Sequence, residues 1–234
     1  MGKTLLGILA RDPVPEEKLF ADQVSAHRRA ALHLRALEDM GEIQIVDDPS
    51  IFVRHEDEKV SFKAVPSIKE LVFQAQQQAK APAAFYGFIN ADVILSPTFL
   101  GDLREAKRKE QDTVILHRTD VDNLSEVSAI CRSADPHQMQ IGRKVNPGNS
   151  ADGILFSKEA LSEFLSTFPD FAVGEPWWDT AAIYWARHSR FSVRHMAENQ
   201  ALHVKHPQAW SFSSPGARRA HELYIELISL WPED

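Results

Sequence analysis

The stretch FYGFINADVILSP, residues 85–97, decides the fold class that this chain is expected to have. Residues 85–89 are short, aromatic and apolar, which is typical of a strand buried on both faces of a parallel sheet. Asn90 and Asp92 follow this strand directly. Two interpretations of Asp92 are open. It is either a turn residue, because Asn and Asp favour turns, or a metal ligand at the rim of a parallel sheet.

Strands and helices alternate along the rest of the chain. Buried strands are predicted at residues 4–10, 43–46, 112–118 and 152–156, and shorter strands at 51–53, 191–196 and 201–206. Helices are predicted at 16–40, 67–81, 175–189 and from residues 96, 157 and 214 onwards. The pattern predicts an α/β fold with a doubly wound, mostly parallel sheet and helices on both faces. The later, shorter strands are candidates for an antiparallel segment.

Capping signals support several of these helices. Ser67 and Glu70 form the pattern of a capping box ahead of an apolar helical stripe. Ser96 and Pro97 have the residue types of an N-cap and a first helical position. Ser157 caps the next predicted helix, and Pro176 lies in the first turn of the one after it.

Composition sets limits on the class of protein. The 234 residues are 44% hydrophobic, enough for a sizeable core, and we expect a single domain over residues 1–234. A net charge of −7 disfavours a nucleic-acid partner, which needs clustered Lys and Arg. Cys131 is the one cysteine, and no apolar run approaches the ~18–20 residues of a membrane span. We therefore expect a soluble, cytoplasmic protein with no transmembrane segment.

Acidic residues follow two of the predicted strands. Asp47 and Asp48 end the strand at residues 43–46, and Asn90 and Asp92 end the strand at 85–89. Open parallel sheets bind ligands at the carboxyl ends of their strands. Mg²⁺ takes one or two carboxylates together with substrate phosphates. Arg11, just past the first strand, is a candidate for contact with a phosphate, although a solvated loop arginine is the simpler interpretation.

Two of these segments resemble a known family. EIQIVDDPS, residues 42–50, is similar to the EIIVVDDGS segment of glycosyltransferases with the GT-A fold, which use nucleotide-sugar donors. FYGFINADVILSPTFLGDL, residues 85–103, resembles the same family's strand, acidic motif and following helix. The resemblance covers residues 4–110 in order and spacing, and the remainder more loosely. It implies a nucleotide-binding half at residues 1–110 and an acceptor and catalytic half at residues 111–234.

The resemblance also implies roles for the acidic residues. Asp47 or Asp48 would contact the nucleobase or ribose, and Asp92 would be the last acid of the family's DxD motif. In that role Asp92 would hold Mn²⁺ or Mg²⁺ against the donor diphosphate. This sequence departs from the pattern, since Asn90 replaces the first acid and Pro49 replaces a glycine. Because the first acid is changed, a protein that binds ligands without catalysing a reaction is an open alternative.

In the family, the general base or the acid that binds the acceptor lies past the middle of the chain, near a helix start. Glu175, Asp179 and Asp152 are the candidates in this sequence. A helix N-terminus stabilises an ionised carboxylate, which suits a base for a hydroxyl proton. The structural interpretation of Glu175 and Asp179 has equal weight, because acids are common in the first turns of helices. Of the neighbouring tryptophans, Trp178 falls on the apolar stripe, so Trp177 is the candidate platform for an acceptor sugar.

Two late histidines are further candidates for the metal. His203 and His206 resemble the late histidine that completes the metal shell in some family members. On a regular strand their spacing places them on opposite faces, so at most one is a natural ligand. Arg118, Asp120 and Asp122 follow another strand and either border the pocket or are ordinary surface charges.

Together these features predict a metal-dependent glycosyltransferase. The expected donor is a nucleotide sugar, with uridine diphosphate as the expected carrier, and the expected acceptor is a glycan or another hydroxyl compound. The alternatives are a non-catalytic nucleotide- or glycan-binding module and a nucleotidyltransferase. A nucleotidyltransferase normally has a Gly-rich loop after the first strand, and ILARDPVPEE, residues 8–17, has none.

Overall fold

The computed structural model describes residues 4–8, 43–45, 52–54, 60–62, 66–79, 82–90, 92–133, 139, 143–144, 151–205 and 215–231. Its strands are β1 (Thr4–Ile8), β2 (Ile43–Ile45), β3 (Phe52–Arg54), β4 (Val60–Phe62), β5 (Tyr86–Ile89), β6 (Val93–Leu95), β7 (Thr113–Val121), β8 (Arg143–Lys144), β9 (Ala151–Phe156), β10 (Val193–His195) and β11 (Ala201–Val204). Its helices are α2 (Ile68–Gln77), α3 (Phe99–Arg108), α4 (Leu124–Arg132), α5 (Lys158–Thr167), α6 (Trp178–His188) and α7 (Pro215–Ser229).

All the described strands except β3 and β4 form one large mixed sheet. Its order is β2-β1-β5-β9-β7-β11-β6, with β8 and β10 also paired to β7, while β3 and β4 form a separate hairpin. β1 is parallel to β2 and β5, and β7 is parallel to β10 and β11. β9 is antiparallel to both of its neighbours, β5 and β7. The α/β prediction is confirmed. The sheet is mixed rather than mostly parallel, because β9, in the middle of the sheet, runs antiparallel to β5 and β7.

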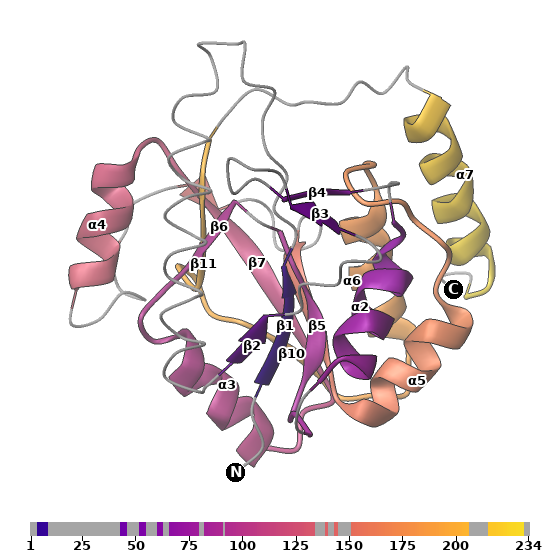
Figure 1. Ribbon diagram of the computed structural model, residues 1–234, viewed down its shortest axis with the longest axis horizontal. Coiled ribbons are helices and arrows are strands. Elements are labelled where there is room, and N and C mark those ends of the chain that lie inside the picture. Colours follow the sequence, from indigo (N-terminus) through magenta and orange to yellow (C-terminus); the bar gives the residue numbers. More distant parts are fainter. Residues whose placement is uncertain are drawn as a thin grey trace.

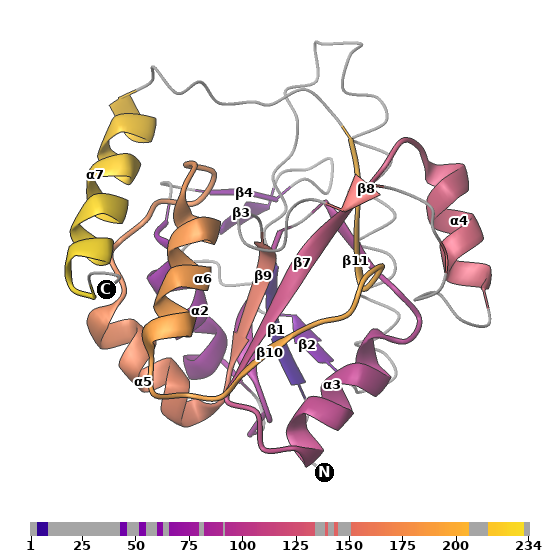
Figure 2. The ribbon, with the colours of Figure 1, turned by 180° about the vertical axis from the view of Figure 1, so that it is seen from behind.

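Helices lie on both sides of the sheet (Figures 1 and 2). α2, α5, α6 and α7 share one apolar core with the sheet, and its largest side chains are aromatic. α3 packs on the opposite face with Phe85, Val114 and Leu116. α4 packs on a separate cluster formed by β6, β7 and β11, whose residues Ile94 and Leu202 alternate with those that face α3. The sheet is thus buried in the middle, and polar side chains are left to its rim.

Local signals explain where several helices begin. The predicted capping box is present at α2: Glu70 N donates to Ser67 Oγ at 3.2 Å, and Ser67 N donates to Glu70 Oε2 at 2.7 Å. Ser157 Oγ accepts from Ala160 N and caps α5 as predicted. The predicted start of α3 is wrong by two residues, since its N-cap is Thr98. Ser96 instead donates its hydroxyl to Gln200 Oε1 at 2.8 Å and ties β6 to β11.

β4, β6, β8 and α4 have no counterpart among the predicted elements. β6 follows Asp92 immediately and pairs antiparallel with β11. α4 lies in the region where the periodic pattern fades, and Asn123 Oδ1 caps it by accepting from Ser125 N and Glu126 N. The helix expected at residues 16–40 lies outside the described residues. Among those residues, no helix is long and apolar enough to cross a membrane.

Candidate functional site

Polar side chains from separate strands gather at one rim of the sheet. Asn90 follows β5, Arg118 and Asp120 lie near the end of β7, and His203 lies in β11 beside them. Because β9 is antiparallel, its beginning lies where β5 and β7 end, which brings Asp152 to the same rim. We call Asn90, Asp92, Arg118, Asp120, Asp152, Asp179 and His203 the rim cluster.

Asn90 is fixed to Asp152 by two hydrogen bonds. Asn90 N donates to Asp152 O at 2.8 Å, and Asn90 Nδ2 donates to Asp152 Oδ1 at 2.9 Å. The backbone bond extends the ladder between β5 and β9 by one residue. The side-chain bond needs the amide nitrogen, because a carboxylate at position 90 would face another carboxylate. Asn90, which departs from the family pattern, therefore suits this pairing.

His203 lies between two carboxylates. Its Nδ1 is 3.0 Å from Asp120 Oδ1, and its Nε2 is 3.3 Å from Asp92 Oδ2. Burial alone would lower the pKa of His203, but the bonds to Asp120 and Asp92 and the charge of Asp152 raise that pKa to about 9. Burial opposes ionisation of Asp120 as well, yet His203 and Arg118 hold the pKa of Asp120 below its usual range. An imidazolium thus occupies the space between Asp92 and Asp120.

Arg118 joins Asp152 to the part of the cluster formed by Asp92, Asp120 and His203. Its Nε is 3.1 Å from Asp120 Oδ1, and one of its terminal nitrogens is 3.8 Å from Asp152 Oδ1. Burial raises the pKa of Asp152 to about 6, against the attraction of Arg118 and His203 and with the repulsion of Asp92 and Asp179. Among the described residues, Asp152 Oδ2 is buried without a hydrogen-bond partner. Burial also raises the pKa of Asp179, which accepts a hydrogen bond from Thr180 N at 2.8 Å.

The buried Asp152 predicts a pH-dependent gain in stability from Asp152→Asn. A folded-state pKa of about 6 against the ordinary 3.8 means that the folded protein binds more protons than the unfolded chain between these values. Stability therefore falls as pH rises from 4 to 6. The free energy of unfolding of the variant, relative to wild type, should grow by up to about 3 kcal/mol between pH 4 and pH 7.

Urea unfolding of both proteins at pH 4, 5, 6 and 7 measures this difference. Asp170→Asn, at an exposed position, is the matched control and should show no such trend. A difference between Asp152→Asn and wild type that stays constant with pH would show that Asp152 ionises without penalty.

The structure separates the remaining predicted residues. Glu175 Oε2 accepts a hydrogen bond from Ala172 N at 3.3 Å, and its Oε1 lies beside Gly216 at the start of α7, so none of its described contacts is with the rim cluster. The indole of Trp177 stacks on Tyr224 of α7, with ring centroids 5.5 Å apart. Arg11, Asp47, Asp48 and His206 lie outside the described residues.

Arg118 and Asp120 are the members of the cluster whose importance sequence reasoning underrated. Both lie on one side of β7, and the strand ends one residue after Asp120. The same rule that selected Asp92, an acid at a strand end, applies to Asp120. Asp122, considered with them, pairs instead with Lys205 on the exposed end of β7 and β11.

The rim cluster has the chemistry of a divalent-cation site that needs help from its substrate. Within the described parts of the chain, no three acidic, His or Cys side chains are arranged to hold a metal by themselves. Asp92 and His203 Nε2 do face one another, and the Nδ1 of His203 is bonded to Asp120. Metal-binding histidines are commonly oriented by a carboxylate in this way. Once a cation has displaced the proton on Nε2, His203 and Asp92 would fit it with phosphate oxygens and water as the remaining ligands.

Comparison with known proteins finds similarity in structure alone. No family model matches the sequence, and neither does any curated protein. S. aureus TarS 1–349 is similar over 100% of this chain and 67% of its own, with 9% identity and a TM-score of 0.50. The chain has a GT-A-like fold. The resemblance seen in the sequence is therefore confirmed at the level of the fold.

Two more distant structures accompany TarS. One is from Desulfovibrio desulfuricans G20 and is provisionally assigned as a nucleotide-diphospho-sugar transferase, with 12% identity, coverage of 97% and 99% of the two chains and a TM-score of 0.47. The other is the inositol-1-phosphate CTP transferase of T. maritima, with 11% identity, coverage of 97% of both chains and a TM-score of 0.41. Identities this low limit the comparison to the fold, so the activity has to be argued from the rim cluster.

Proposed function

We propose that this protein is a glycosyltransferase that moves a sugar from a nucleotide-sugar donor to an acceptor hydroxyl with the help of Mn²⁺ or Mg²⁺. The observation that carries the proposal is the rim cluster itself. Arg118 contacts Asp120 and Asp152, and His203 joins Asp120 to Asp92, so side chains from separate segments of the chain meet on a GT-A-like sheet. A purely structural role does not require burial of Asp152 at a cost in stability, and such costs are typical of functional sites.

The donor would be held by Asp92 and His203, through the cation, and by Arg118. Asp92 and His203 would bind the cation, which supplies Lewis-acid stabilisation of the leaving diphosphate. The guanidinium of Arg118 would oppose the negative charge of the donor. Asp47 or Asp48 would contact the base or ribose, with uridine as the proposed base, and Arg11 would contact a phosphate. Residues 1–110 would thus form the donor half of a single domain.

The acceptor would approach from the other half, residues 111–234. Asp179 is our proposed general base, because it lies at the start of α6 and its raised pKa brings it closer to neutrality, where bases work best. Asp152 is a positioning residue, since its carboxylate holds Asn90 and faces Arg118. The transition state is expected to resemble an oxocarbenium ion, as in glycosyl transfer generally. A carboxylate beside that centre stabilises its positive charge.

A binding module without turnover is the second candidate. The observation that favours it is Asn90, whose amide is committed to Asp152 and offers the metal no negative charge. Release of free nucleotide from a nucleotide sugar separates the two candidates. A nucleotidyltransferase, the third alternative, would release pyrophosphate from a nucleoside triphosphate instead.

Uridine diphosphate with Mn²⁺ is expected to stabilise the folded protein. A ligand at a hundredfold excess over its Kd adds about 2.7 kcal/mol, which for a chain of this size raises Tm by roughly 5–10 °C. Differential scanning fluorimetry with uridine, guanosine, adenosine and cytidine diphosphates, each with and without Mn²⁺, measures the shift. The shift should be largest for uridine and should need the metal. If no nucleoside diphosphate changes Tm with or without metal, the proposed donor site is wrong.

A further inference from the structure

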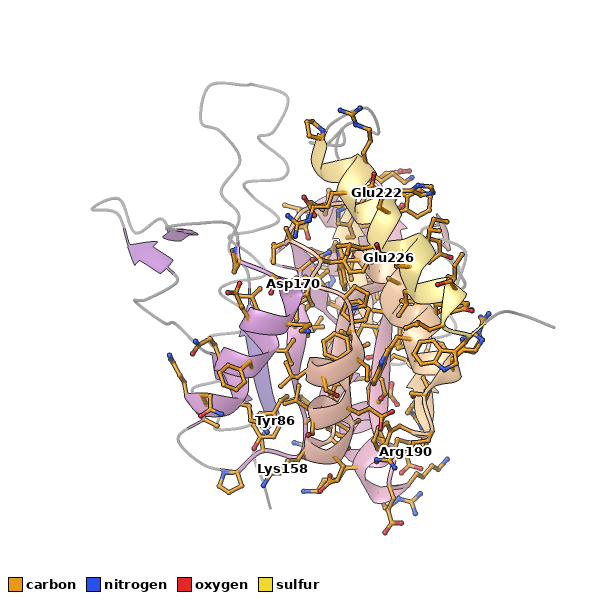
Figure 3. All side chains as sticks on the ribbon, turned by 90° about the vertical axis from the view of Figure 1, so that its right-hand side faces the viewer. Tyr86, Lys158, Asp170, Arg190, Glu222 and Glu226 are labelled. Carbon is orange, nitrogen blue, oxygen red and sulfur yellow. The ribbon has the colours of Figure 1, made fainter. Side chains whose placement is uncertain are left out.

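A hollow lies apart from the rim cluster, between the start of α6 and helix α7. It is a cavity of about 220 Å³ lined by Trp177, Ala217, Arg218, His221 and Glu222. No member of the rim cluster lines it. Arg218, His221 and Glu222 are exposed along α7, and Figure 3 labels Glu222, which lies in the middle of that helix. The cavity is therefore open to a ligand from solution.

The lining has the chemistry of a carbohydrate subsite. One face of a pyranose ring carries C–H groups that are weakly positive, and they pack on the electron-rich face of an indole. Sugar hydroxyls both donate and accept, so they match a guanidinium donor, a carboxylate acceptor and an imidazole that does either. Arg218 and Glu222 have opposite charges, which favours a neutral sugar over a phosphate or another anion. A small cavity with one aromatic wall and a few polar groups fits a single ring.

Trp177 is held in place for contact with a ligand. Its φ of 74° is left-handed, a conformation that strains a bulky residue, and its side chain does not cap α6. Tyr224 and His221 of α7 hold the indole, with ring centroids at 5.5 and 5.2 Å. A Cβ on Gly216 would lie 2.6 Å from Glu175 Oε1, so α7 is also fitted closely against the segment before α6. The indole of Trp177 and the backbone of α7 are thus held in place before any ligand binds.

Trp177 and Asp179 point away from each other. Side chains two residues apart at a helix start do not share a face. Trp177 contacts α7, whereas Asp179 is close enough to Asp152 to raise its pKa. One sugar ring on Trp177 is therefore not the ring whose hydroxyl reaches Asp179. We propose that the cavity is a remote subsite that holds one ring of a neutral oligosaccharide acceptor while another ring lies at Asp179. This inference rests on the proposed function.

Saturation-transfer NMR and titration with neutral mono-, di- and tetrasaccharides of glucose, galactose and N-acetylglucosamine test the subsite on the full chain. Two linked contacts should make a tetrasaccharide of one series bind at least about tenfold more tightly than its monosaccharide. The double variant Arg218→Ala/Glu222→Ala should lose that tenfold preference. The matched control is Arg219→Ala/Glu226→Ala, which removes the same charges from exposed positions of α7 that do not line the cavity. The control should retain the preference.

The Tm shift with uridine diphosphate and Mn²⁺ is measured on the same three proteins. Shifts that are equal in all three, combined with loss of the length preference in the cavity variant alone, support the subsite. A nucleotide shift without any length preference, or with one that survives Arg218→Ala/Glu222→Ala, overturns the subsite and leaves the donor site standing. Absence of the nucleotide shift in wild type counts instead against the proposed function.

Discussion

Replacing Asp92 by Asn is expected to abolish metal-dependent nucleotide binding while leaving the fold intact. The amide has the shape of the carboxylate but carries no negative charge to hold a divalent cation beside a diphosphate. Loss of a residue that only orients a metal ligand weakens affinity by 10–100-fold, so loss of a ligand should weaken it by at least about a hundredfold. The Tm without ligand should change little, because the amide keeps the size of the side chain and can still accept from His203.

Isothermal titration of uridine diphosphate with and without Mn²⁺ decides between the two interpretations of Asp92. Asp122→Asn is the matched control, since Asp122 lies at the same end of the sheet but pairs with the exposed Lys205. The control should bind like wild type. If Asp92→Asn also keeps its metal-dependent affinity, Asp92 is a turn residue between β5 and β6 and not a ligand.

The opening stretch shows how far the sequence alone leads. Apolar residues followed by Asn90 and Asp92 predicted β5 and its polar end, because a doubly buried strand has a strong local signal. β6 was missed because its three residues, after Asn90 and Asp92, are too few to mark a strand by their own pattern. Only pairing with β11, about a hundred residues later, makes them a separate strand. Local patterns do not contain that information.

The same limit applies to the site. Strand ends identified Asp92, and the spacing argument allowed only one of the two late histidines as a ligand. The structure places His203 between Asp92 and Asp120, two contacts that join segments more than 80 residues apart. In the sequence Asp120 resembled an ordinary surface charge, because its partner His203 lies 83 residues further along the chain. The antiparallel β9 also had no local signal, although its direction is what brings Asp152 to the rim.

Helix starts were a weaker guide to the acceptor side. Glu175 and Asp179 were equivalent by sequence, since both are acids near the start of one helix. The described contacts of Glu175 are with Ala172 N and the start of α7, whereas Asp179 faces Asp152 and Arg118. The left-handed Trp177 lies between them and redirects the chain. A backbone turn of this kind, which sequence rules assign to Gly or Asn, separated two residues that otherwise looked alike.

Asp179→Asn is expected to remove most sugar transfer without weakening donor binding. General-base catalysis contributes about 10²–10⁴-fold, so the rate of transfer at saturating donor should fall by that factor. The amide keeps the size of the side chain and can still accept from Thr180 N, so the start of α6 should be preserved. Burial raises the pKa of Asp179, so its charge is unfavourable in the folded protein. Because Asn carries no charge, the variant should be as stable as wild type at neutral pH or slightly more stable.

Glu175→Gln is the matched control, because it makes the same chemical change four residues earlier, where the side chain contacts Ala172 N and not the rim cluster. Transfer is followed as release of nucleotide in the presence of an acceptor, and donor affinity by titration with Mn²⁺. The expected result is a loss confined to Asp179→Asn, with equal donor affinity in all three proteins. Wild-type transfer by Asp179→Asn would mean that Asp179 takes no proton from the acceptor. A loss in Glu175→Gln alone would move the base to the side of α6 that faces α7, because that is where its carboxylate lies.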